Sequence, residues 1–237
     1  KPISIQYQLN EFAIFRLAVR NKVTLYDPSA MVHTKQKIIQ AATELYNNNE
    51  IASVRLQQIA DLAGLSIGNL AYHFKNKEAI TLAVVQDLSL EVKEILKIFR
   101  QTSDFLDFDR QLSEWFCFHQ QYAFYFSDHA PWPGQELQQL RIQSLSRLIF
   151  QIQKRFDFHR KRGNINHNIT AAKERAVAET IGMIITLWPS YRRLQGQPVG
   201  SEEEYKRAVW NQIIPYFTSR GLTEYTQLIQ PLLSSTE

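Results

Sequence analysis

The sequence predicts an all-α protein with two helical domains. Apolar residues recur every three or four positions over most of the 237 residues, which is the period of an amphipathic helix. Eight glycines and eight prolines are too few to punctuate a fold built from many strands and tight turns. Hydrophobic residues make up 44% of the chain and charged residues 21%, as in ordinary globular proteins. We therefore expect a substantial core between helices.

The first thirty residues fit this pattern least well. Ile3 to Leu9 alternate in the manner of a short strand, and Asp27-Pro28-Ser29 interrupts the chain. Two hypotheses follow: residues 1–30 are an N-terminal extension that is not native, with Met31 as the natural start, or they are an arm that packs on the body. With this segment set apart, we expect domains at 31–80 and 81–237.

Residues 34–47 are predicted to form the first helix, with Thr34 as its N-cap and Ile38 and Leu45 on its buried face. Lys35 lies in the first turn of this helix. A positive charge there opposes the helix dipole, which costs a little stability but suits a nearby phosphate. The alternative for Lys35 is an ordinary solvated surface lysine.

Residues 55–77 contain two short apolar-periodic segments on either side of Gly64. Glycine can take the left-handed backbone that a tight corner between helices needs, and Ser66 is a good N-cap for the second helix. Two helices joined by a short glycine-containing turn are the signature of a helix-turn-helix, whose second helix enters the major groove of DNA. An ordinary helical hairpin would show the same pattern.

The residues of this motif point to one family. Within residues 59–79 the strings IA, AGLS, GNL, YHF and KNKEA occur in order. They resemble the DNA-binding domain of the TetR family of bacterial transcriptional regulators over roughly residues 34–82. One position departs from the family pattern, since Ala71 stands where an aromatic residue is usual. That departure removes one common contact to the DNA backbone.

The candidate DNA-binding residues come from both helices and from the turns around them. Asparagine and glutamine can contact adenine with two hydrogen bonds, whereas tyrosine and histidine more often touch phosphates or thymine methyl groups. The lysine at the start of the fourth helix is a frequent phosphate contact in the TetR family. The candidates are Lys35, Arg55, Gln57, Ile67, Gly68, Asn69, Tyr72, His73 and Lys77.

The larger domain is predicted to hold six further helices. The first of them links the DNA-binding domain to the rest and would carry any signal between them. Their expected spans are residues 77–99, 103–126, 135–162, 170–194, 201–217 and 221–233.

A ligand pocket is expected within residues 104–195, because the resemblance to TetR-family regulators implies one. Residues 115–126 read WFCFHQQYAFYF, and their apolar character nearly all round indicates a buried helix. Bundle pockets are mostly apolar with a few placed polar groups, so the effector would be small and largely apolar or aromatic. Plain core packing is the alternative for every candidate. The candidates are Trp115, His119, Tyr122, Phe126, Thr180, Ile184 and Trp188.

The resemblance also implies a homodimer formed by the last two helices. A two-fold dimer would place two recognition helices on successive turns of DNA and would require a palindromic operator. Packing within one chain is the alternative. The candidate interface residues are Tyr205, Val209, Ile213, Tyr216, Tyr225, Leu228 and Leu232.

Several classes of protein are disfavoured by what the sequence contains. The single Cys117 excludes an internal disulfide, and its aromatic surroundings favour a small buried hydrophobe over a nucleophile. We find no catalytic constellation, phosphate-binding loop or metal-ligand spacing, and expect no enzyme, cofactor or metal. No apolar run is long enough to cross a membrane and no signal peptide is visible, so we expect a cytoplasmic protein without a membrane partner.

The sequence therefore predicts a ligand-responsive transcriptional regulator, in particular a repressor, with double-stranded DNA, a small-molecule effector and a second copy of itself as partners. The formal net charge of +4 permits a nucleic-acid partner without requiring one. The alternative is a helical small-molecule-binding protein or a partner-binding module in which residues 55–77 are only scaffold.

Overall fold

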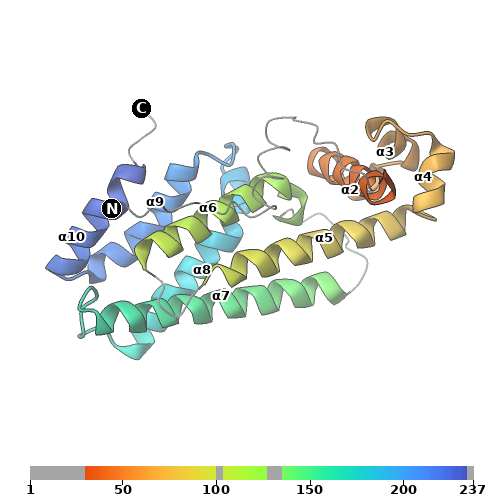
Figure 1. Cartoon of the computed structure of the whole chain (residues 1–237). Coiled ribbons are helices and arrows are strands. Elements are labelled where there is room, and N and C mark those ends of the chain that lie inside the picture. Colours follow the sequence, from red (N-terminus) through yellow and green to blue (C-terminus); the bar gives the residue numbers. More distant parts are fainter. Residues whose placement is uncertain (1–29, 100–103, 127–134, 234–237) are drawn as a thin grey trace, which may run out of the picture. The chain divides into compact units, whose positions relative to one another are not determined.

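The computed structural model describes residues 30–99, 104–126 and 135–233 (Figure 1). The alternating segment near the N-terminus therefore lies outside the described residues. The chain divides into two compact units, residues 1–37 and residues 38–237. The first helix crosses the boundary between these units, and all of the following helices belong to the second.

The described residues form α-helices joined by turns and short 3-10 helices. Their only β structure is one isolated bridge between Ile165 and Phe217, so the predicted all-α class is confirmed. The α-helices are α2 (Ala30–Asn48), α3 (Leu56–Leu62), α4 (Ile67–His73), α5 (Lys77–Lys97), α6 (Phe105–Gln121), α7 (Gln135–Lys161), α8 (Ala171–Leu194), α9 (Glu202–Ile213) and α10 (Ser219–Leu228). The 3-10 helices are η1 (Ile51–Ser53), η2 (Ala123–Phe126), η3 (Ile214–Tyr216) and η4 (Gln230–Leu233).

Side-chain caps define most of the helix starts, as the sequence predicts. Each capping side chain accepts a hydrogen bond from the backbone N–H three residues later, which satisfies a donor that has no partner inside the helix. The capping box of Ser201 and Glu204 is also present. The predicted cap Ser66 forms, and the side chains of Asn76, Asp104, Thr170 and Ser201 cap their helices in the same way.

Three predicted boundaries are wrong. Helix α2 already begins at Ala30, so Thr34 lies inside it and does not cap it. The predicted helix over residues 103–126 ends at Gln121, because Tyr122 leaves the helical backbone and η2 follows. The last helix begins earlier than expected, since the hydroxyl of Thr218 caps it by accepting from Gly221 N at 3.1 Å.

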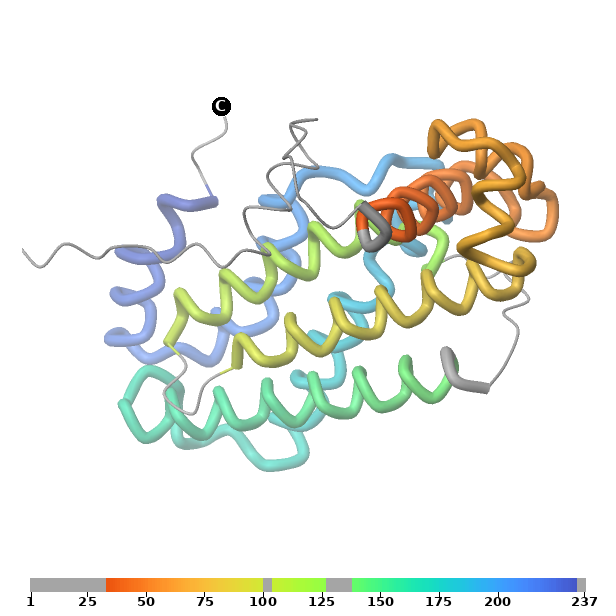
Figure 2. Tube along the Cα trace, turned by 45° about the vertical axis from the view of Figure 1, so that its right-hand side comes forward, coloured from red at the N-terminus to blue at the C-terminus, as the bar shows by residue number. Residues whose placement is uncertain are grey.

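The helices of the larger domain pack in pairs. Figure 2 shows α5 continuing from the recognition helix into the larger domain, where α6 and α7 contact it. Helix α7 and helix α8 form a long hairpin. Gly182 permits their close approach, because a Cβ there would lie 3.1 Å from side-chain atoms of both Leu145 and Ile149.

Two buried glutamines close the end of α5. The last carbonyls of a helix have no partner inside it. Gln111 of α6 donates from Nε2 to the carbonyl of Ile95 at 3.0 Å, and Gln151 of α7 donates to the carbonyl of Leu96 at 2.8 Å. The two amides also contact one another at 3.1 Å. One set of hydrogen bonds therefore joins three helices.

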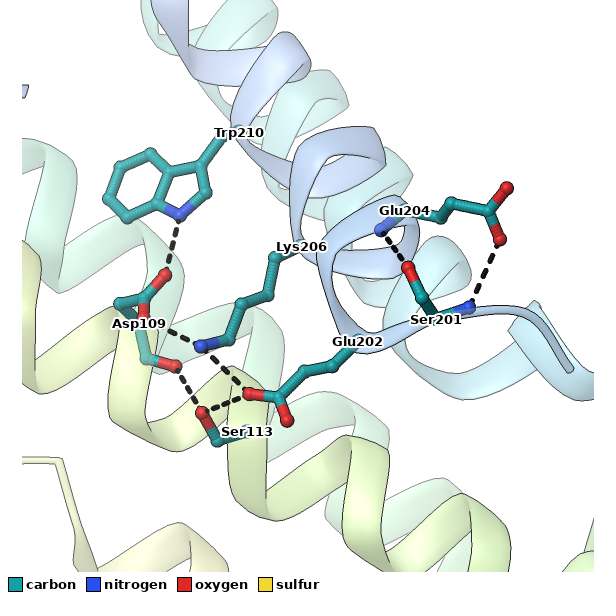
Figure 3. A network of polar contacts seen from close by, with 7 residues as sticks. All are labelled: Asp109, Ser113, Ser201, Glu202, Glu204, Lys206 and Trp210. Atoms are coloured by element: carbon teal, nitrogen blue, oxygen red, sulfur yellow. Dashed lines mark hydrogen bonds and ion pairs between the residues drawn. The ribbon is translucent and has the colours of Figure 1, made fainter. Parts of the chain in front are cut away.

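An ion pair in the interior joins α6 to α9 (Figure 3). The Lys206 ammonium lies 2.7 Å from Asp109, and the other carboxylate oxygen of Asp109 accepts from the indole N–H of Trp210 at 3.1 Å. Glu202 lies 2.9 Å from the same ammonium and accepts from the hydroxyl of Ser113 at 2.6 Å. Burial lowers the pKa of Lys206, but the hydrogen bonds and charges of Asp109 and Glu202 outweigh that and raise it.

Removing the cation of this pair should destabilise the fold strongly. Lys206→Met leaves the Asp109 carboxylate buried without its counter-charge, which costs about 3–5 kcal/mol in comparable pairs. We expect that loss in the free energy of unfolding measured by urea denaturation, and a smaller one in the double variant Asp109→Asn with Lys206→Met. The control Arg175→Met breaks an exposed pair with Glu179 and should change stability by less than about 0.5 kcal/mol. Equal losses in Lys206→Met and Arg175→Met would contradict the assignment.

Candidate DNA-binding and ligand-binding sites

Helices α3 and α4 form the predicted helix-turn-helix. Gly64 has a φ of +69°, in the left-handed region that favours glycine, and the backbone N–H of Leu65 returns to the carbonyl of Ala60 at 2.9 Å. Ile59 and Leu70 are completely buried, one from each helix. The turn chemistry and the buried residues together fix the angle at which α4 leaves the corner.

The recognition helix α4 presents the predicted base-reading residues to solvent. Tyr72 is 74% exposed and Ile67 is 44% exposed, and both Gly68 and Asn69 are exposed. His73 is partly buried, with its ring 5.2 Å from that of Tyr72. The exposed side of α4 is therefore free of packing within the described residues.

Two candidates near α4 already have partners inside the protein. The Gln57 amide donates to the Asp61 carboxylate at 2.7 Å. The Lys77 ammonium donates to the carbonyl oxygens of Ala52 and Val54 at 3.0 and 2.7 Å, so it holds the η1 turn that precedes α3. A phosphate contact by Lys77 would share or replace these bonds, and it stays a prediction.

The other two basic candidates are exposed. Arg55 precedes α3, where its backbone N–H donates to the Gln58 side chain at 2.8 Å and leaves the guanidinium in solvent. Lys35 lies on α2 and is also exposed.

The DNA-binding helices are tied to η2 by side-chain contacts. Asn47 donates to the carbonyl of Gln121 at 2.9 Å and accepts from the backbone N–H of Phe124 at 3.1 Å. The Tyr46 ring meets the edge of Phe124 at 5.9 Å. Tyr122 donates from its hydroxyl to Asp87 of α5 at 3.0 Å. A shift of η2 would therefore be felt by both α2 and α5.

Five of the seven predicted ligand residues lie in the core of the larger domain. Trp115, His119, Tyr122, Phe126 and Trp188 are each at most 9% exposed, and several of their rings pack against one another or their neighbours. The structure places them in core packing, which was the alternative interpretation of this stripe. Their direct contact with a ligand stays a prediction.

The other two predicted ligand residues lie on α8. Ile184 is partly buried against the core. Thr180 donates its hydroxyl to the carbonyl of Ala176 at 2.9 Å and lines a hollow of about 180 Å³ with Lys173 and Tyr216. Thr180 is the only one of the seven predicted residues that lines this hollow, so the seven do not share it.

A cavity of about 20 Å³ lies between α6, α7 and α9, at residues that the sequence analysis missed. Arg155 lines it and is 4% exposed, and His159 lines it at 3%. The signal was present in the sequence: Arg155 falls three residues after Ile152 and His159 four residues after Arg155, which places both on the apolar stripe of α7. The other lining residues are Phe105, Phe108, Ile152, Phe156, Ile165, Trp210 and Ile213.

The predicted dimer residues divide into two groups. Tyr205, Val209, Ile213 and Tyr225 are buried inside the chain, at most 8% exposed, so they offer almost no surface to a second copy. This burial agrees with the alternative, packing within one chain, and their place at an interface stays a prediction. Tyr216, Leu228 and Leu232 keep exposed or partly exposed surface.

The described residues hold no group of three or more histidine, cysteine, aspartate or glutamate side chains placed to bind a metal ion. Nor does any helix in the described ranges have the length and hydrophobicity needed to cross a membrane.

The fold and the exposed recognition helix define a helix-turn-helix protein with a larger helical domain, and comparisons with known proteins agree. Residues 38–84 match the family model described as bacterial regulatory proteins, tetR family. The transcriptional regulator RutR of Escherichia coli K12 is 39% identical over 67 residues, which are 28% of this chain and 32% of RutR. The chain thus spans about a third of the length of the curated relative it matches.

Solved structures extend the likeness to the whole fold. A TetR-family transcriptional regulator from Marinobacter aquaeolei VT8 aligns with a TM-score of 0.66 at 23% identity, over 85% of this chain and 97% of that one. The complex of SmeT with triclosan aligns with a TM-score of 0.57 at 14% identity, over 79% and 93% of the two chains. The chain therefore carries a segment that matches the tetR-family model, and its fold is similar to that of TetR-family regulators.

Acid should destabilise this fold through His119. Its Nε2 donates to the carbonyl of Ile185 at 2.7 Å, while Nδ1 is buried without a hydrogen-bond partner. Burial lowers the pKa of His119 from 6.5 to about 3, so the unfolded chain binds this proton first as the pH falls below 6.5. Between pH 7.5 and pH 5 the loss from this residue is about 2 kcal/mol.

The measurement is the free energy of unfolding across this range for the wild type and for His119→Gln, which keeps a donor but does not titrate. We expect a shallower pH dependence in the variant. His159 contributes in the same direction, because burial and then the charges of Arg162 and Arg155 lower its pKa to about 4. An unchanged slope in His119→Gln would show that His119 is not a source of the acid sensitivity.

Proposed function

We propose that this chain is a ligand-responsive transcriptional regulator that binds a palindromic operator as a homodimer and releases it when a small effector binds. The observation that carries the proposal is the recognition helix: Ser66 caps it, Leu70 anchors it in the core, and Asn69 and Tyr72 stand exposed on it. We favour repression over activation as the mode of regulation, because release of the operator on effector binding would then turn transcription on.

In this proposal the exposed residues of α4 read the bases. Asn69 would contact adenine with two hydrogen bonds, and Tyr72 and His73 would contact phosphates or thymine methyl groups. Gln57 can join them if its amide leaves Asp61. Lys77, Arg55 and Lys35 would contact phosphates and so position the protein on the DNA backbone.

Selection of random duplex DNA by the full chain at physiological salt tests this reading. The wild type should enrich a palindrome whose half-sites are spaced by about one helical turn or a multiple of it. Asn69→Ala should lose about 1–3 kcal/mol of discrimination at one base position of each half-site. The control Asn211→Ala, an exposed asparagine of α9, should select the same sequence as the wild type. Binding that fades with salt and enriches no sequence would refute operator recognition.

The dimer is proposed to form on the α7–α8 hairpin, which is a revision of the expected position. Helix α8 carries an exposed apolar stripe, Met183, Leu187, Tyr191 and Leu194, between 50% and 85% exposed. On α7, Ile142 is 58% exposed. Large apolar patches of this kind on a globular protein mark interaction surfaces.

The exposed apolar residues of α7 and those of α8 lie on the same side of the hairpin. Gly182 of α8 faces Ile149 of α7, and each is followed by an exposed apolar residue, Met183 and Phe150. Because the helices are antiparallel, the residue that follows a contact position in each helix lies on the same side of the pair. The hairpin therefore offers one continuous apolar face, and two copies would form a four-helix interface.

Leu187→Glu should disrupt this interface, because it puts a charge in the centre of the apolar face. Sedimentation at micromolar concentration should then show the 27.7 kDa monomer in place of a dimer. The matched control is Leu232→Glu, which changes a leucine of similar exposure, 49% against 54%, near the end of the chain. Dissociation by the Leu232 change alone would return the interface to the last two helices.

The effector is proposed to bind in the larger domain and to act on η2 and α5. Asn47 and Tyr122 connect these elements to the DNA-binding helices. SmeT, which shares the fold, is solved in complex with triclosan. By this likeness we expect this chain to bind a small molecule, whose binding would favour one of two spacings of the DNA-binding domains.

A further inference from the structure

The cavity beside Arg155 is lined by hydrogen-bond donors without acceptors to match them. Arg155 is almost completely buried, and its three guanidinium nitrogens have no hydrogen-bond partner among the described residues. Its cation lies over the rings of Phe99 and Phe108, at 4.8 and 4.9 Å from their centres. These ring contacts support the charge only in part, because an isolated buried cation carries a large desolvation cost.

A second donor comes from His159. The Asn164 side-chain NH₂ can only donate, and it lies 3.2 Å from His159 Nδ1, so Nδ1 is the acceptor and the proton is on Nε2. That Nε2–H is buried and has no partner in the described part of the chain. Arg155 and His159 are one turn apart on α7 and line the same cavity. The cavity therefore holds unsatisfied donors from two side chains.

The acidic groups nearby are occupied elsewhere. Asp107 acts electrostatically on Arg155, but its carboxylate is paired with Arg110 at 2.5 Å. Asp104 acts on His159, but its carboxylate caps α6 by accepting from the backbone N–H of Asp107 at 2.9 Å. The Asp109 carboxylate is held by Lys206 and Trp210. No carboxylate in the described residues is hydrogen-bonded to Arg155, so Asp107 balances its charge only through space.

We propose that this cavity binds the carboxylate of a small monocarboxylic acid, with Arg155 as the fork that receives both oxygens and His159 as a second donor. The planar guanidinium matches a carboxylate in shape and charge. A cavity of about 20 Å³ holds one or two waters, since a single water needs about 10–15 Å³ on this measure, so a carboxylate enters only if the lining side chains move apart. The walls of Phe105, Phe156 and Trp210 suit a short apolar body and exclude a second charge.

The inference that this acid is the effector rests on the proposed function, and it revises the expected effector from a largely apolar molecule to an anionic one. The route to the DNA-binding domain is short. Phe108 and Arg155 belong to α6 and α7, the helices whose Gln111 and Gln151 side chains close the end of α5. Filling the cavity would act on the packing of these three helices.

Thermal unfolding of the full chain tests the binding site without reference to DNA. A ligand that binds only the folded state stabilises it, so sodium acetate should raise the unfolding midpoint by several degrees. Acetamide, an uncharged analogue of the same shape, should not raise it. Sodium chloride at the same concentration as the acetate should not raise it either. Arg155→Met should lose the acetate response. The matched control Arg147→Met removes an exposed arginine of the same helix and should keep it.

The proposal is overturned if acetamide or chloride raises the midpoint as much as acetate does. It is also overturned if Arg155→Met responds to acetate as strongly as the wild type. If Arg155→Met does not fold, Arg155→Lys keeps the charge without the fork and should respond more weakly than the wild type. An equal response in that variant would also count against the fork. The wild-type comparison of acetate with acetamide needs no variant.

Release of the selected operator separates this proposal from the regulator itself. Acetate should lower operator affinity in the wild type and not in Arg155→Met, at constant ionic strength. If acetate stabilises the chain and no operator is selected, the carboxylate site stands and the proposed regulator fails. If an operator is selected and acetate neither stabilises the chain nor releases the DNA, the regulator stands and the carboxylate site is refuted.

Discussion

The closure of α5 by Gln111 and Gln151 is the interaction on which the arrangement of the larger domain depends. A helix end inside a core needs partners for its last carbonyl groups, and these two buried amides supply them from α6 and α7. At its other end the same helix contacts α2, where the hydroxyl groups of Thr81 and Tyr46 lie 2.9 Å apart. In the proposed regulator, α5 would carry a change of packing at its C-terminal end to its N-terminal end, because it is one continuous hydrogen-bonded helix.

Polar groups, more than apolar ones, give this interior its specificity. Asp109 with Lys206, Gln111 with Gln151, and His119 with the carbonyl of Ile185 each join helices that are distant in sequence. A misaligned helix would leave these groups buried and unpaired, which costs far more than the loss of an apolar contact. Arg155 differs from these groups, because all three of its guanidinium nitrogens are buried without a hydrogen-bond partner in the described residues.

The apolar residues of α9 and α10 are more buried within the chain than those of the α7–α8 hairpin. Aromatic residues of α9 and α10 fill the interior around Trp210 and Tyr205, so these helices complete the core of their own chain. The α7–α8 hairpin instead leaves apolar residues in solvent along its length. The family resemblance suggested an interface on the last two helices, whereas the exposed apolar residues of α7 and α8 are the basis of the interface that we propose.

The sequence alone determined the features that local chemistry controls. The helical period, the Gly64 corner and the caps at Ser66, Asn76 and Ser201 act over a few residues, so the all-α class and the helix-turn-helix could be predicted. Only the tertiary structure decided which polar residues are buried and which apolar residues are left exposed. Tyr205 and Leu187 both fit an apolar helical stripe, yet one is buried and the other is 54% exposed. That difference depends on which helices come to cover each face, and helices distant in the chain make those contacts.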